Sequence, residues 1–258
     1  MDKLKVVKIG GNVIDNPEML TAFLKDFAAL EGAKILVHGG GKKASEISRG
    51  IGHEPKMVDG RRITEEKDLE IITMVYGGLI SKNIVAQLQA LNCTALGLSG
   101  ADGNSITSVK RPVNPIDFGF VGDVIAVNAD FIHGLIQQGI APVYCAITHD
   151  NNGQLFNTNA DTIAAELAVG LSKYYETELI YCFEKKGVLE DVDDEDSAIP
   201  EINTASYESL KKEGKIHSGM LPKLHNCFDA LERNVNVVKI GSTDMLKSGN
   251  EIYTKLKL

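Results

Sequence analysis

Short runs of β-branched and other apolar residues alternate along this chain with segments of helical periodicity, and glycines mark several of the junctions. The strand expected over Val6–Ile9 is followed by Gly10-Gly11, and the strand expected over Lys34–His38 is followed by Gly39-Gly40-Gly41. Between them, Asn16 is placed to cap a helix that begins with proline. Strands and helices that alternate at these lengths form βαβ units. The sequence therefore predicts the α/β class, as a three-layer αβα sandwich around a mostly parallel sheet.

The rest of the chain continues the same alternation. Further strands are expected over residues 94–98, 141–147, 178–183 and 235–240, hairpin strands over 106–124, and an edge strand over 252–256. Further helices are expected over residues 41–52, 64–91, 128–138, 159–171 and 204–213, with one more after 222. In an open parallel sheet, ligands bind beyond the carboxyl ends of the strands. The strand-to-helix junctions are therefore where we look for chemistry.

The overall charge and the cysteines restrict the kinds of protein this can be. The chain has 35 acidic side chains against 27 Lys and Arg, a net charge of −8, so we expect no binding to nucleic acid, which needs clustered Lys and Arg. The four cysteines lie far apart without a C-x-x-C pair, which favours buried free thiols in a reducing compartment. We find no signal peptide, and no apolar run of the roughly 18 residues that span a membrane. These features predict a cytoplasmic protein without membrane contact.

Two glycine-rich junctions within the first 41 residues indicate a site for anionic groups. Glycines at a helix N-terminus let backbone N–H groups approach an anion, although ordinary tight turns carry glycine as well. Lys8, at the end of a strand, and Lys223, at the start of a helix, add positive charge at the ends of elements. Each alone could be a surface lysine. Together they suit the neutralisation of a phosphoryl group in transfer.

Two other motifs indicate rival functions. Gly39-x-Gly41-x-x-Ala44, with Asp59 twenty residues beyond Gly39, fits the dinucleotide fingerprint of an NAD-linked oxidoreductase. Gly97-Leu98-Ser99-Gly100-Ala101 is similar to the nucleophile elbow of a hydrolase, but the last glycine of that motif is missing. A non-catalytic protein that binds small anions is a third alternative. Neither the oxidoreductase nor the anion-binding protein has a use for the paired lysines, and the hydrolase is only weakly indicated.

Six segments spread over almost the whole chain carry motifs that occur together in one family. They are Val7–Gly11, Val37–Gly41, Asp59–Thr64, Gly97–Gly103, Asn157–Asp161 and Ser218–Lys223. In this order they resemble the amino-acid-kinase superfamily and, within it, the acetylglutamate kinases. The resemblance implies the fold of that superfamily. It also implies transfer of the γ-phosphoryl group of ATP to the γ-carboxylate of N-acetyl-L-glutamate, a step of arginine biosynthesis.

By this resemblance, three residues would perform the phosphoryl transfer. Lys8 and Lys223 would stabilise the transferring group, and Asp161 would hold the two lysines in place; alternatively, Asp161 only pairs with the dipole of its own helix. A glutamate γ-carboxylate has a reference pKa of about 4.3, so it is an ionised nucleophile at neutral pH and needs no general base. The difficulty is to bring two anions together, and Mg²⁺ and two lysines can supply the compensating charge.

The resemblance also implies four residues that would bind the amino-acid substrate. Gly40 and Gly41 would bind it through backbone N–H groups, and Asn157 would bind its acylated amino group. Arg62 would pair with the α-carboxylate, for which a guanidinium can supply two parallel hydrogen bonds. No motif contacts the acyl group directly. N-succinyl-L-glutamate is therefore kept as an alternative substrate, which would need a further cation or N–H donor.

For the nucleotide, the resemblance implies a C-terminal lobe, residues 173–258, that binds ATP with its Mg²⁺, beside an N-terminal lobe, residues 1–172, for the acylglutamate. Gly10 and Gly11 would cradle the nucleotide phosphates. Further contacts are expected from Glu184, Lys185, Lys186, Gly187, Val188 and Leu189, and from Lys215, Ile216 and His217. Here the chain departs from the family, because Phe183–Gly187 stands where Thr/Ser-Asp-Val usually precedes the glycine. No resident metal site is expected, since Mg²⁺ arrives with ATP.

The long helical pattern over residues 64–91 bears on the oligomeric state. It carries more apolar positions than one lobe obviously needs, and we expect a homodimer across it. The alternative is a helix that buries these positions within its own lobe. The chain begins only seven residues before Lys8. That leaves no room for the N-terminal helix by which arginine-inhibited hexameric relatives link their dimers, so we expect no hexamer.

Overall fold

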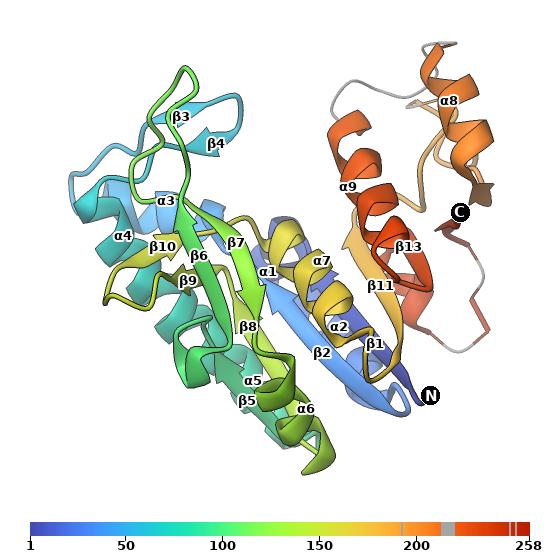
Figure 1. Cartoon of the computed structure of the whole chain (residues 1–258), viewed down its shortest axis with the longest axis horizontal. Coiled ribbons are helices and arrows are strands. Elements are labelled where there is room, and N and C mark those ends of the chain that lie inside the picture. The colour runs from blue at the N-terminus through green and yellow to red at the C-terminus, as the bar shows by residue number, and fades with distance from the viewer. Residues whose placement is uncertain (192, 213–219, 248, 251) are drawn as a thin grey trace. The chain divides into compact units, whose positions relative to one another are not determined.

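The chain forms two compact units in the computed structural model, which describes residues 1–191, 193–212, 220–247, 249–250 and 252–258. Unit 1 consists of Met1–Ile35 and Ala164–Leu258, and unit 2 consists of Leu36–Ile163. The chain leaves unit 1 within strand β2 and returns to it within helix α7, both labelled in Figure 1. Unit 1 is therefore built from two separate stretches of sequence.

This division differs from the boundary expected at residue 172. Strand β1 (Lys3–Ile9) pairs in parallel with β11 (Glu176–Phe183) along its whole length, from Lys3 opposite Glu176 to Ile9 opposite Cys182. These backbone hydrogen bonds join the first strand to the C-terminal part of the chain. The N-terminal 35 residues consequently belong to unit 1.

Unit 1 is built on a sheet with the strand order β12-β14-β13-β11-β1. Its other elements are α1 (Gly11–Asp15), α2 (Pro17–Ala29), β12 (Glu201–Ile202), α8 (Thr204–Lys212), α9 (Leu221–Glu232), β13 (Val237–Ser242), the 3₁₀ turn η3 (Thr243–Leu246) and β14 (Thr254–Leu256). The predicted start of α2 is confirmed, because Asn16 Oδ1 accepts hydrogen bonds from the backbone N–H groups of Glu18 and Met19.

The C-terminal strand does not lie where the sequence analysis placed it. Instead of forming an edge, β14 lies between β13 and the short strand β12. It runs antiparallel to β13 and parallel to β12. The expectation of an edge strand over 252–256 was wrong because β12 is only two residues long and gave no periodic signal of its own.

Unit 2 contains three sheets. The parallel strands have the order β2-β8-β5, a second sheet has the order β10-β9-β6-β7, and β3 and β4 form a hairpin. The elements are β2 (Ala33–His38), α3 (Gly41–Gly50), β3 (Met57–Val58), β4 (Arg61–Arg62), α4 (Glu66–Ile72), the π-helix η1 (Thr73–Ile80), α5 (Ser81–Ala90), β5 (Ala95–Leu98), η2 (Asp102–Asn104), β6 (Ile106–Lys110), β7 (Gly122–Val127), α6 (Ala129–Gln137), β8 (Ala141–Cys145), β9 (Ile147–His149), β10 (Leu155–Asn157) and the first turn of α7 (Ala160–Leu171).

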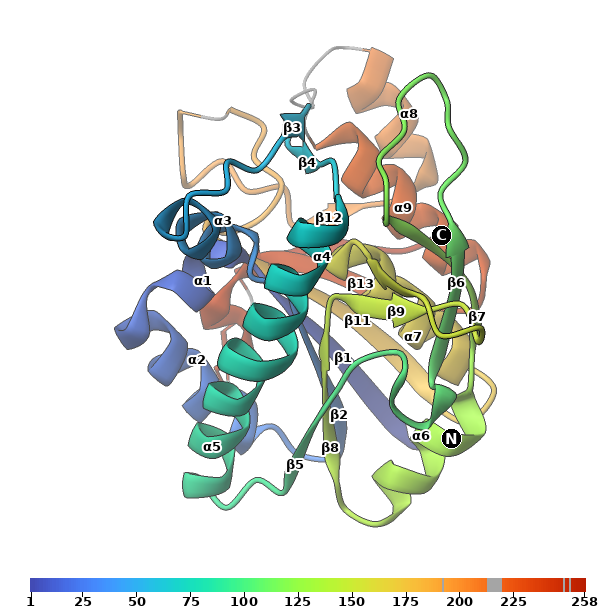
Figure 2. The same ribbon diagram turned by 90° about the vertical axis from the view of Figure 1, so that its left-hand side faces the viewer.

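Helices lie on both faces of the parallel strands in each unit (Figure 2). In unit 1, α1 and α2 lie on one side of β1 and β11, and α7 and α9 lie on the other. In unit 2, α5 and α6 lie on opposite sides of β5 and β8. Right-handed crossovers require this, because the connections from β2 to β5 and from β5 to β8 run in opposite directions across the sheet. The predicted α/β fold with αβα layers is confirmed.

A continuous helical run in unit 2 combines α4, η1 and α5, from Glu66 to Ala90. By length and composition alone, this run could cross a membrane. That is weak evidence for a membrane span, because core helices of soluble proteins meet the same criteria. The sequence analysis expected the helix but not its π-helical middle. A π-helix adds a residue to each turn and is frequent at functional sites.

The cysteines are free and buried, as predicted: Cys93, Cys145, Cys182 and Cys227. Burial raises the pKa of the Cys145 thiol to about 12 and also raises the pKa of Cys182. Both thiols are protonated at neutral pH. They pack as small hydrophobic side chains and do not act as nucleophiles.

Candidate functional site

Two lysines of unit 1 lie against the same aromatic ring. Lys8 is the next-to-last residue of β1 and is buried, and Lys223 lies in the first turn of α9. The Nζ atom of Lys8 lies 5.0 Å from the ring centroid of Phe183, and that of Lys223 lies 4.1 Å from it. The negative face of a phenyl ring attracts a cation. Phe183 is the last residue of β11, which pairs in parallel with β1. The ring therefore lies at the carboxyl ends of these two strands, with Lys8 and Lys223 beside it.

The first glycine junction lies beside this ring. Gly10 follows β1 directly and donates its N–H to the carbonyl oxygen of Cys182 at 3.0 Å. A Cβ atom on Gly10 would lie 3.3 Å from that oxygen and 3.9 Å from the Phe183 ring. Helix α1 starts at the next residue, Gly11. The small residue keeps the backbone close to the ring that gathers the lysines.

Beyond Phe183, Glu184 is exposed, and the two lysines predicted to contact the nucleotide are paired with acidic residues. Lys185 Nζ lies 2.8 Å from Glu195 Oε1, and Lys186 Nζ lies 2.5 Å from Asp196 Oδ1. These hydrogen bonds raise the pKa of both lysines and lower the pKa of both carboxyl groups. All four groups are exposed, so each pair contributes little to stability. Glu195 and Asp196, at the end of the acidic stretch, are therefore joined to this segment by ion pairs.

The remainder of the predicted nucleotide segment faces inward. Val188 and Leu189 are buried, and the N–H of Val188 donates to Thr254 Oγ1 at 2.8 Å. A Cβ atom on Gly187 would come within 2.6 Å of the same hydroxyl oxygen. The carbonyl oxygen of Val188 is engaged as well, because it accepts the N–H of Ile199 at 2.8 Å. The predicted residues Lys215, Ile216 and His217 lie outside the described part of the chain.

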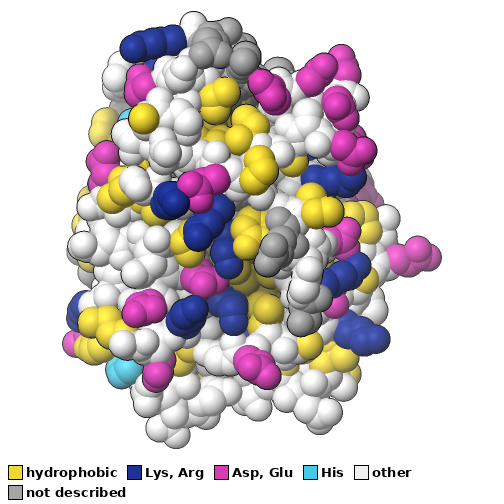
Figure 3. Space-filling model, turned by 90° about the vertical axis from the view of Figure 1, so that its right-hand side faces the viewer, with side chains coloured by type: hydrophobic (Ala, Val, Ile, Leu, Met, Phe, Trp, Pro, Cys, Tyr) yellow, Lys and Arg dark blue, Asp and Glu magenta, His cyan; other side chains and the backbone are white. Residues whose placement is uncertain are grey.

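Charges of both signs are interspersed on the face of the molecule drawn in Figure 3. In unit 1, for example, Lys239 pairs with Glu178 at 3.1 Å and Lys257 with Glu201 at 2.8 Å. A nucleic acid needs clustered positive charge.

In unit 2, the second glycine loop is pressed against the π-helix. Gly40 has φ of +151°, and a Cβ atom there would overlap the Ile80 side chain and approach the Tyr76 ring to 3.0 Å. No larger residue fits this position. Helix α3 begins at Gly41, where a Cβ atom would lie 3.7 Å from the Tyr76 hydroxyl. Burial raises the pKa of Tyr76 to about 12, against the opposing effect of Arg62, so its hydroxyl is a neutral donor beside the loop.

Arg62 is attached to this loop by hydrogen bonds. It is buried in β4, and its Nη2 donates to the carbonyl oxygen of Gly41 at 3.2 Å and to Ser45 Oγ at 2.6 Å. Its Nη1 donates to Asp68 Oδ1 at 3.4 Å. Asp68 is itself buried, so the arginine charge is balanced within the protein interior. The predicted substrate arginine and the predicted glycine loop therefore form one structure.

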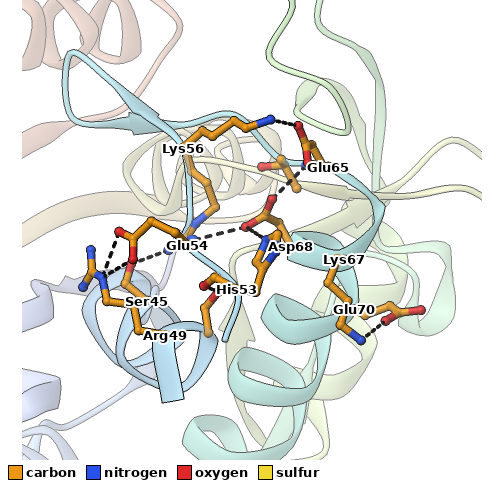
Figure 4. Close-up of polar contacts among 12 residues, drawn as sticks. Ser45, Arg49, His53, Glu54, Lys56, Glu65, Lys67, Asp68 and Glu70 are labelled. Carbon is orange, nitrogen blue, oxygen red and sulfur yellow. Dashed lines mark hydrogen bonds and ion pairs between the residues drawn. The ribbon is translucent and has the colours of Figure 1, made fainter. Parts of the chain in front are cut away.

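Asp68 links Arg62 to helix α4 and to His53 (Figure 4). Its Oδ2 accepts the backbone N–H of Glu65 at 3.1 Å, which is half of the capping box at the start of α4. Its Oδ1 lies 3.2 Å from His53 Nε2. One buried carboxylate thus contacts a helix terminus and a guanidinium and lies beside an imidazole. Around this cluster, Figure 4 also shows the peripheral pairs Arg49–Glu54, Lys56–Glu65 and Lys67–Glu70.

Asn157 lies in the same unit and is oriented by Thr64. Its Nδ2 donates to the Thr64 hydroxyl at 3.0 Å, two residues along the chain from Arg62. Asp161 lies in the first turn of α7, and its backbone N–H is capped by Asn159 Oδ1 at 2.7 Å. Asp161 belongs to unit 2 and the lysines to unit 1, so its role toward them stays a prediction.

A buried histidine ends β2 immediately before the glycine loop. His38 Nδ1 lies 2.8 Å from the carbonyl oxygen of Gly39, so the neutral ring donates from Nδ1. Burial lowers the pKa of His38 to about 4, although the contact with Gly39 acts in the opposite direction. Among the residues that the structure describes, its Nε2 has no hydrogen-bond partner. The ring is neutral at physiological pH.

Sequence reasoning did not find four residues that shape these sites: Phe183, Tyr76, Ser45 and Asp68. The capping-box spacing from Glu65 to Asp68 was a usable signal, since it places an acidic residue at the third position of a helix. Phe183 was noted only as a departure from the family. Tyr76 gave no signal, because its contact with the loop depends on the π-helical turn.

The geometry weakens both rival motifs. Asp59 lies in the turn between β3 and β4 with φ of +49°, outside the βαβ unit in which a dinucleotide fingerprint places its acidic residue. Ser99 Oγ donates to Asp102 Oδ2 at 2.7 Å, whereas a nucleophilic serine needs a histidine base. Among the described residues, no three His, Cys, Asp or Glu side chains converge as they would to hold a metal ion.

Comparison with known proteins gives consistent results. The sequence profile of the Amino acid kinase family matches residues 3–249. A protein of Cytophaga hutchinsonii named acetylglutamate kinase is 57% identical over 99% of this chain and 99% of its own length. One of Parabacteroides distasonis with the same name is 51% identical over 96% of this chain and 98% of its own.

A solved structure shares the fold. N-acetylglutamate synthase from Neisseria gonorrhoeae, complexed with coenzyme A and N-acetyl-glutamate, gives a TM-score of 0.81 at 20% identity. The match covers 99% of this chain and 59% of that one. At this level of identity, the likeness concerns the fold alone.

Proposed function

Because this chain belongs to the amino acid kinase family, we propose that it transfers the γ-phosphoryl group of ATP to the γ-carboxylate of N-acetyl-L-glutamate. The observation that carries the proposal is the pair of lysines, Lys8 and Lys223, against the Phe183 ring. Two cations at one place suit a transition state whose charge is spread over phosphoryl oxygens. The names of the full-length relatives supply the substrate.

In the proposed reaction, a γ-carboxylate oxygen attacks the γ-phosphorus of ATP. The bond from that phosphorus to the bridging oxygen breaks, and ADP leaves with the electron pair. The products are ADP and the acyl phosphate. Lys8 and Lys223 balance the negative charge as the two anions meet, and Asp161 keeps the lysines in place. The ionised carboxylate needs no base, in keeping with a His38 ring that is neutral and buried.

Substrate binding is assigned to unit 2 and the phosphate chain to unit 1. Arg62, Asn157 and the backbone of Gly40 and Gly41 hold the acylglutamate. Gly10, Gly11 and residues 184–189, with 215–217, hold the nucleotide. Mg²⁺ arrives with ATP as part of the substrate and supplies further positive charge to the phosphates. The product places the enzyme in arginine biosynthesis, and the buried free thiols suit the cytoplasm.

We also propose a homodimer that forms across the run from Glu66 to Ala90. Met74 is 59% exposed and Leu79 is 44% exposed on this run, and these are the apolar side chains that the proposed interface would cover. Light scattering at micromolar concentration should give twice the mass of the chain for the wild type. Met74→Glu should shift the mass toward that of the monomer. A monomeric or hexameric wild type would contradict the dimer.

The test of the activity uses hydroxylamine, which traps an acyl phosphate as its hydroxamate. With MgATP and N-acetyl-L-glutamate, we expect equal amounts of ADP and hydroxamate. N-succinyl-L-glutamate, the alternative substrate, should give a lower kcat/KM, because the pocket would have to bury an unpaired carboxylate. A higher value for the succinyl compound would reassign the acyl group. Tight binding of NAD without binding of ATP in calorimetry would overturn the kinase.

A further inference from the structure

We propose that Ser45 occupies the donor of Arg62 that the substrate carboxylate must take, and that Asp68 is the positioning residue that holds the guanidinium during this exchange. The proposal rests on the assignment of Arg62 to the substrate carboxylate. It goes beyond that assignment, because it names the groups that set how tightly the carboxylate is bound.

The argument begins with the donors of the guanidinium. Arg62 has five N–H groups in a fixed plane. Both hydrogens of Nη2 are used, one toward the Gly41 carbonyl oxygen at 3.2 Å and one toward Ser45 Oγ at 2.6 Å. One hydrogen of Nη1 points to Asp68 Oδ1 at 3.4 Å. The two donors that remain are Nε–H and the second Nη1–H.

These two remaining donors cannot bind one carboxylate as a fork. A guanidinium offers two forks, Nε with Nη2 and Nη1 with Nη2, and each includes a hydrogen of Nη2. With Nη2 fully engaged, a carboxylate can form only single hydrogen bonds to Arg62. The paired geometry expected from the sequence therefore requires that one protein acceptor leave Nη2.

Ser45 is the acceptor that can leave. The Gly41 oxygen belongs to the backbone at the start of α3 and cannot turn away. The Ser45 side chain is half-exposed, and its hydroxyl already donates to the same Gly41 oxygen at 2.9 Å. It can keep that hydrogen bond, or form one to water, when a carboxylate takes Nη2. Rotation about one side-chain bond is enough.

Asp68 keeps the guanidinium in place meanwhile. Its carboxylate is 2% exposed, and its other oxygen, Oδ2, accepts the backbone N–H of Glu65 at 3.1 Å. It is a fixed negative charge beside Nη1. Without it, Arg62 would keep only the contacts on Nη2, one of which the substrate competes for. The two residues therefore have opposite effects: Ser45 opposes substrate binding and Asp68 supports it.

The kinetic test compares single variants that are expected to change KM in opposite directions. Asp68→Asn keeps an oxygen for the capping box but loses the charge, and should raise KM for N-acetyl-L-glutamate by about tenfold or more. Ser45→Ala frees a donor on Nη2 and should lower the same KM by roughly threefold. Ser45→Thr retains the hydroxyl and should behave as the wild type. In all three, kcat and KM for MgATP should change by less than about twofold.

A second measurement needs no substrate. A guanidinium held at several nitrogens rotates slowly, so the ¹⁵N-labelled wild type should show separate Nη–H resonances for Arg62. Asp68→Asn should average them. Glu70→Gln is the matched control and should leave them unchanged, because Glu70 is an exposed residue of the same helix that pairs with Lys67.

Two results would overturn the proposal. Unchanged Arg62 resonances in Asp68→Asn would remove the positioning role, whatever the activity. A raised KM in Ser45→Ala, or an equal loss of kcat and of both substrate affinities in Asp68→Asn, would show a merely structural role. If the resonances respond as expected but the wild type forms no acyl phosphate, the positioning stands and the proposed kinase activity fails.

Discussion

The two units hold their positive charges in different ways. In unit 1, the amino groups of Lys8 and Lys223 lie 5.0 and 4.1 Å from the centroid of the Phe183 ring, a surface that attracts cations without directing them. In unit 2, Arg62 donates to three acceptors: a backbone oxygen, a hydroxyl and a carboxylate.

Under the proposed mechanism, the difference matches what each charge has to do. An ammonium group on a flexible stem can follow a phosphoryl group as it moves from one oxygen to another, and a ring does not compete with the phosphate for the ammonium's hydrogen bonds. A carboxylate that is only bound stays where it is, so a rigid planar group can recognise it. Lysines therefore suit the moving group and arginine the stationary one.

The largest expected effect comes from removing the charge of either lysine of unit 1. Lys8→Met and Lys223→Met should each lower kcat by about 10²–10³ with little change in either KM, because the charge matters chiefly in the transition state. Steady-state kinetics with both substrates measures this. Lys25→Met, at an exposed lysine of α2 in the same unit, is the control and should keep full activity. Near-normal kcat in both site variants would remove the lysines from the mechanism.

The next largest effect concerns His38, a residue of unit 2 whose buried ring is uncharged. Folded His38 has a pKa of about 4 against an ordinary 6.5, so the unfolded chain binds more protons below pH 6.5 and stability falls as the pH drops. From pH 7.5 to pH 5 this one group should remove roughly 2 kcal/mol of the free energy of unfolding. Urea unfolding at both pH values measures it.

The matched variant is His38→Asn, whose amide can still donate to the Gly39 oxygen but does not titrate. It should be less stable at pH 7.5, because a smaller side chain leaves a cavity. Its stability should depend on pH less than that of the wild type, by the same roughly 2 kcal/mol. An equal pH dependence in both proteins would show that the ring is protonated inside the fold.

A smaller effect is expected when lysine replaces Arg62, which keeps the positive charge but removes the planar guanidinium. Arg62→Lys should raise KM for N-acetyl-L-glutamate by about tenfold while kcat changes little, because the planar arrangement of donors is lost. Initial rates at saturating MgATP give both constants. If KM is unchanged, charge alone suffices and the α-carboxylate lies elsewhere.

The smallest effect removes the ring between the lysines. Phe183→Leu keeps an apolar side chain but has no π-system, and a cation–π contact is worth about 0.5–2 kcal/mol. We expect kcat to fall by a few fold, with KM for N-acetyl-L-glutamate unchanged. Phe183→Tyr keeps the ring and should restore the wild-type rate. A leucine variant with full activity would mean that the lysines are positioned by other contacts.

Much of the fold could be predicted because its signals are local. The cap at Asn16, the apolar spacing of α2 and the glycines after β1 and β2 each act over a few residues. The position of β14 could not be predicted, because it depends on β12, a strand of two residues about fifty positions earlier in the chain. Hydrophobic periodicity is a local signal and does not predict which distant strand is the partner.

The site residues show the same contrast between local signals and long-range contacts. Arg62 and Asn157 were found through their motifs, but the partners that orient them were not. Ser45 lies 17 residues before Arg62, and Thr64 lies 93 residues before Asn157. Which hydroxyl meets which donor is decided by the path of the β3–β4 hairpin and of β10. Only the three-dimensional structure shows these contacts.

The discontinuity of unit 1 has a consequence for how the protein is made. Lys3 pairs with Glu176, so β1 must wait for 173 further residues before β11, its neighbour in unit 1, exists. At about 5–20 residues per second, that wait lasts roughly 9–35 seconds, during which the uninterrupted stretch 36–163 can fold first. The pairing that completes unit 1 around β1 is thus made late. Lys8 is made long before Lys223, so under the proposed mechanism the ribosome completes the residues that hold the amino acid before it completes the pair of lysines that assists phosphoryl transfer.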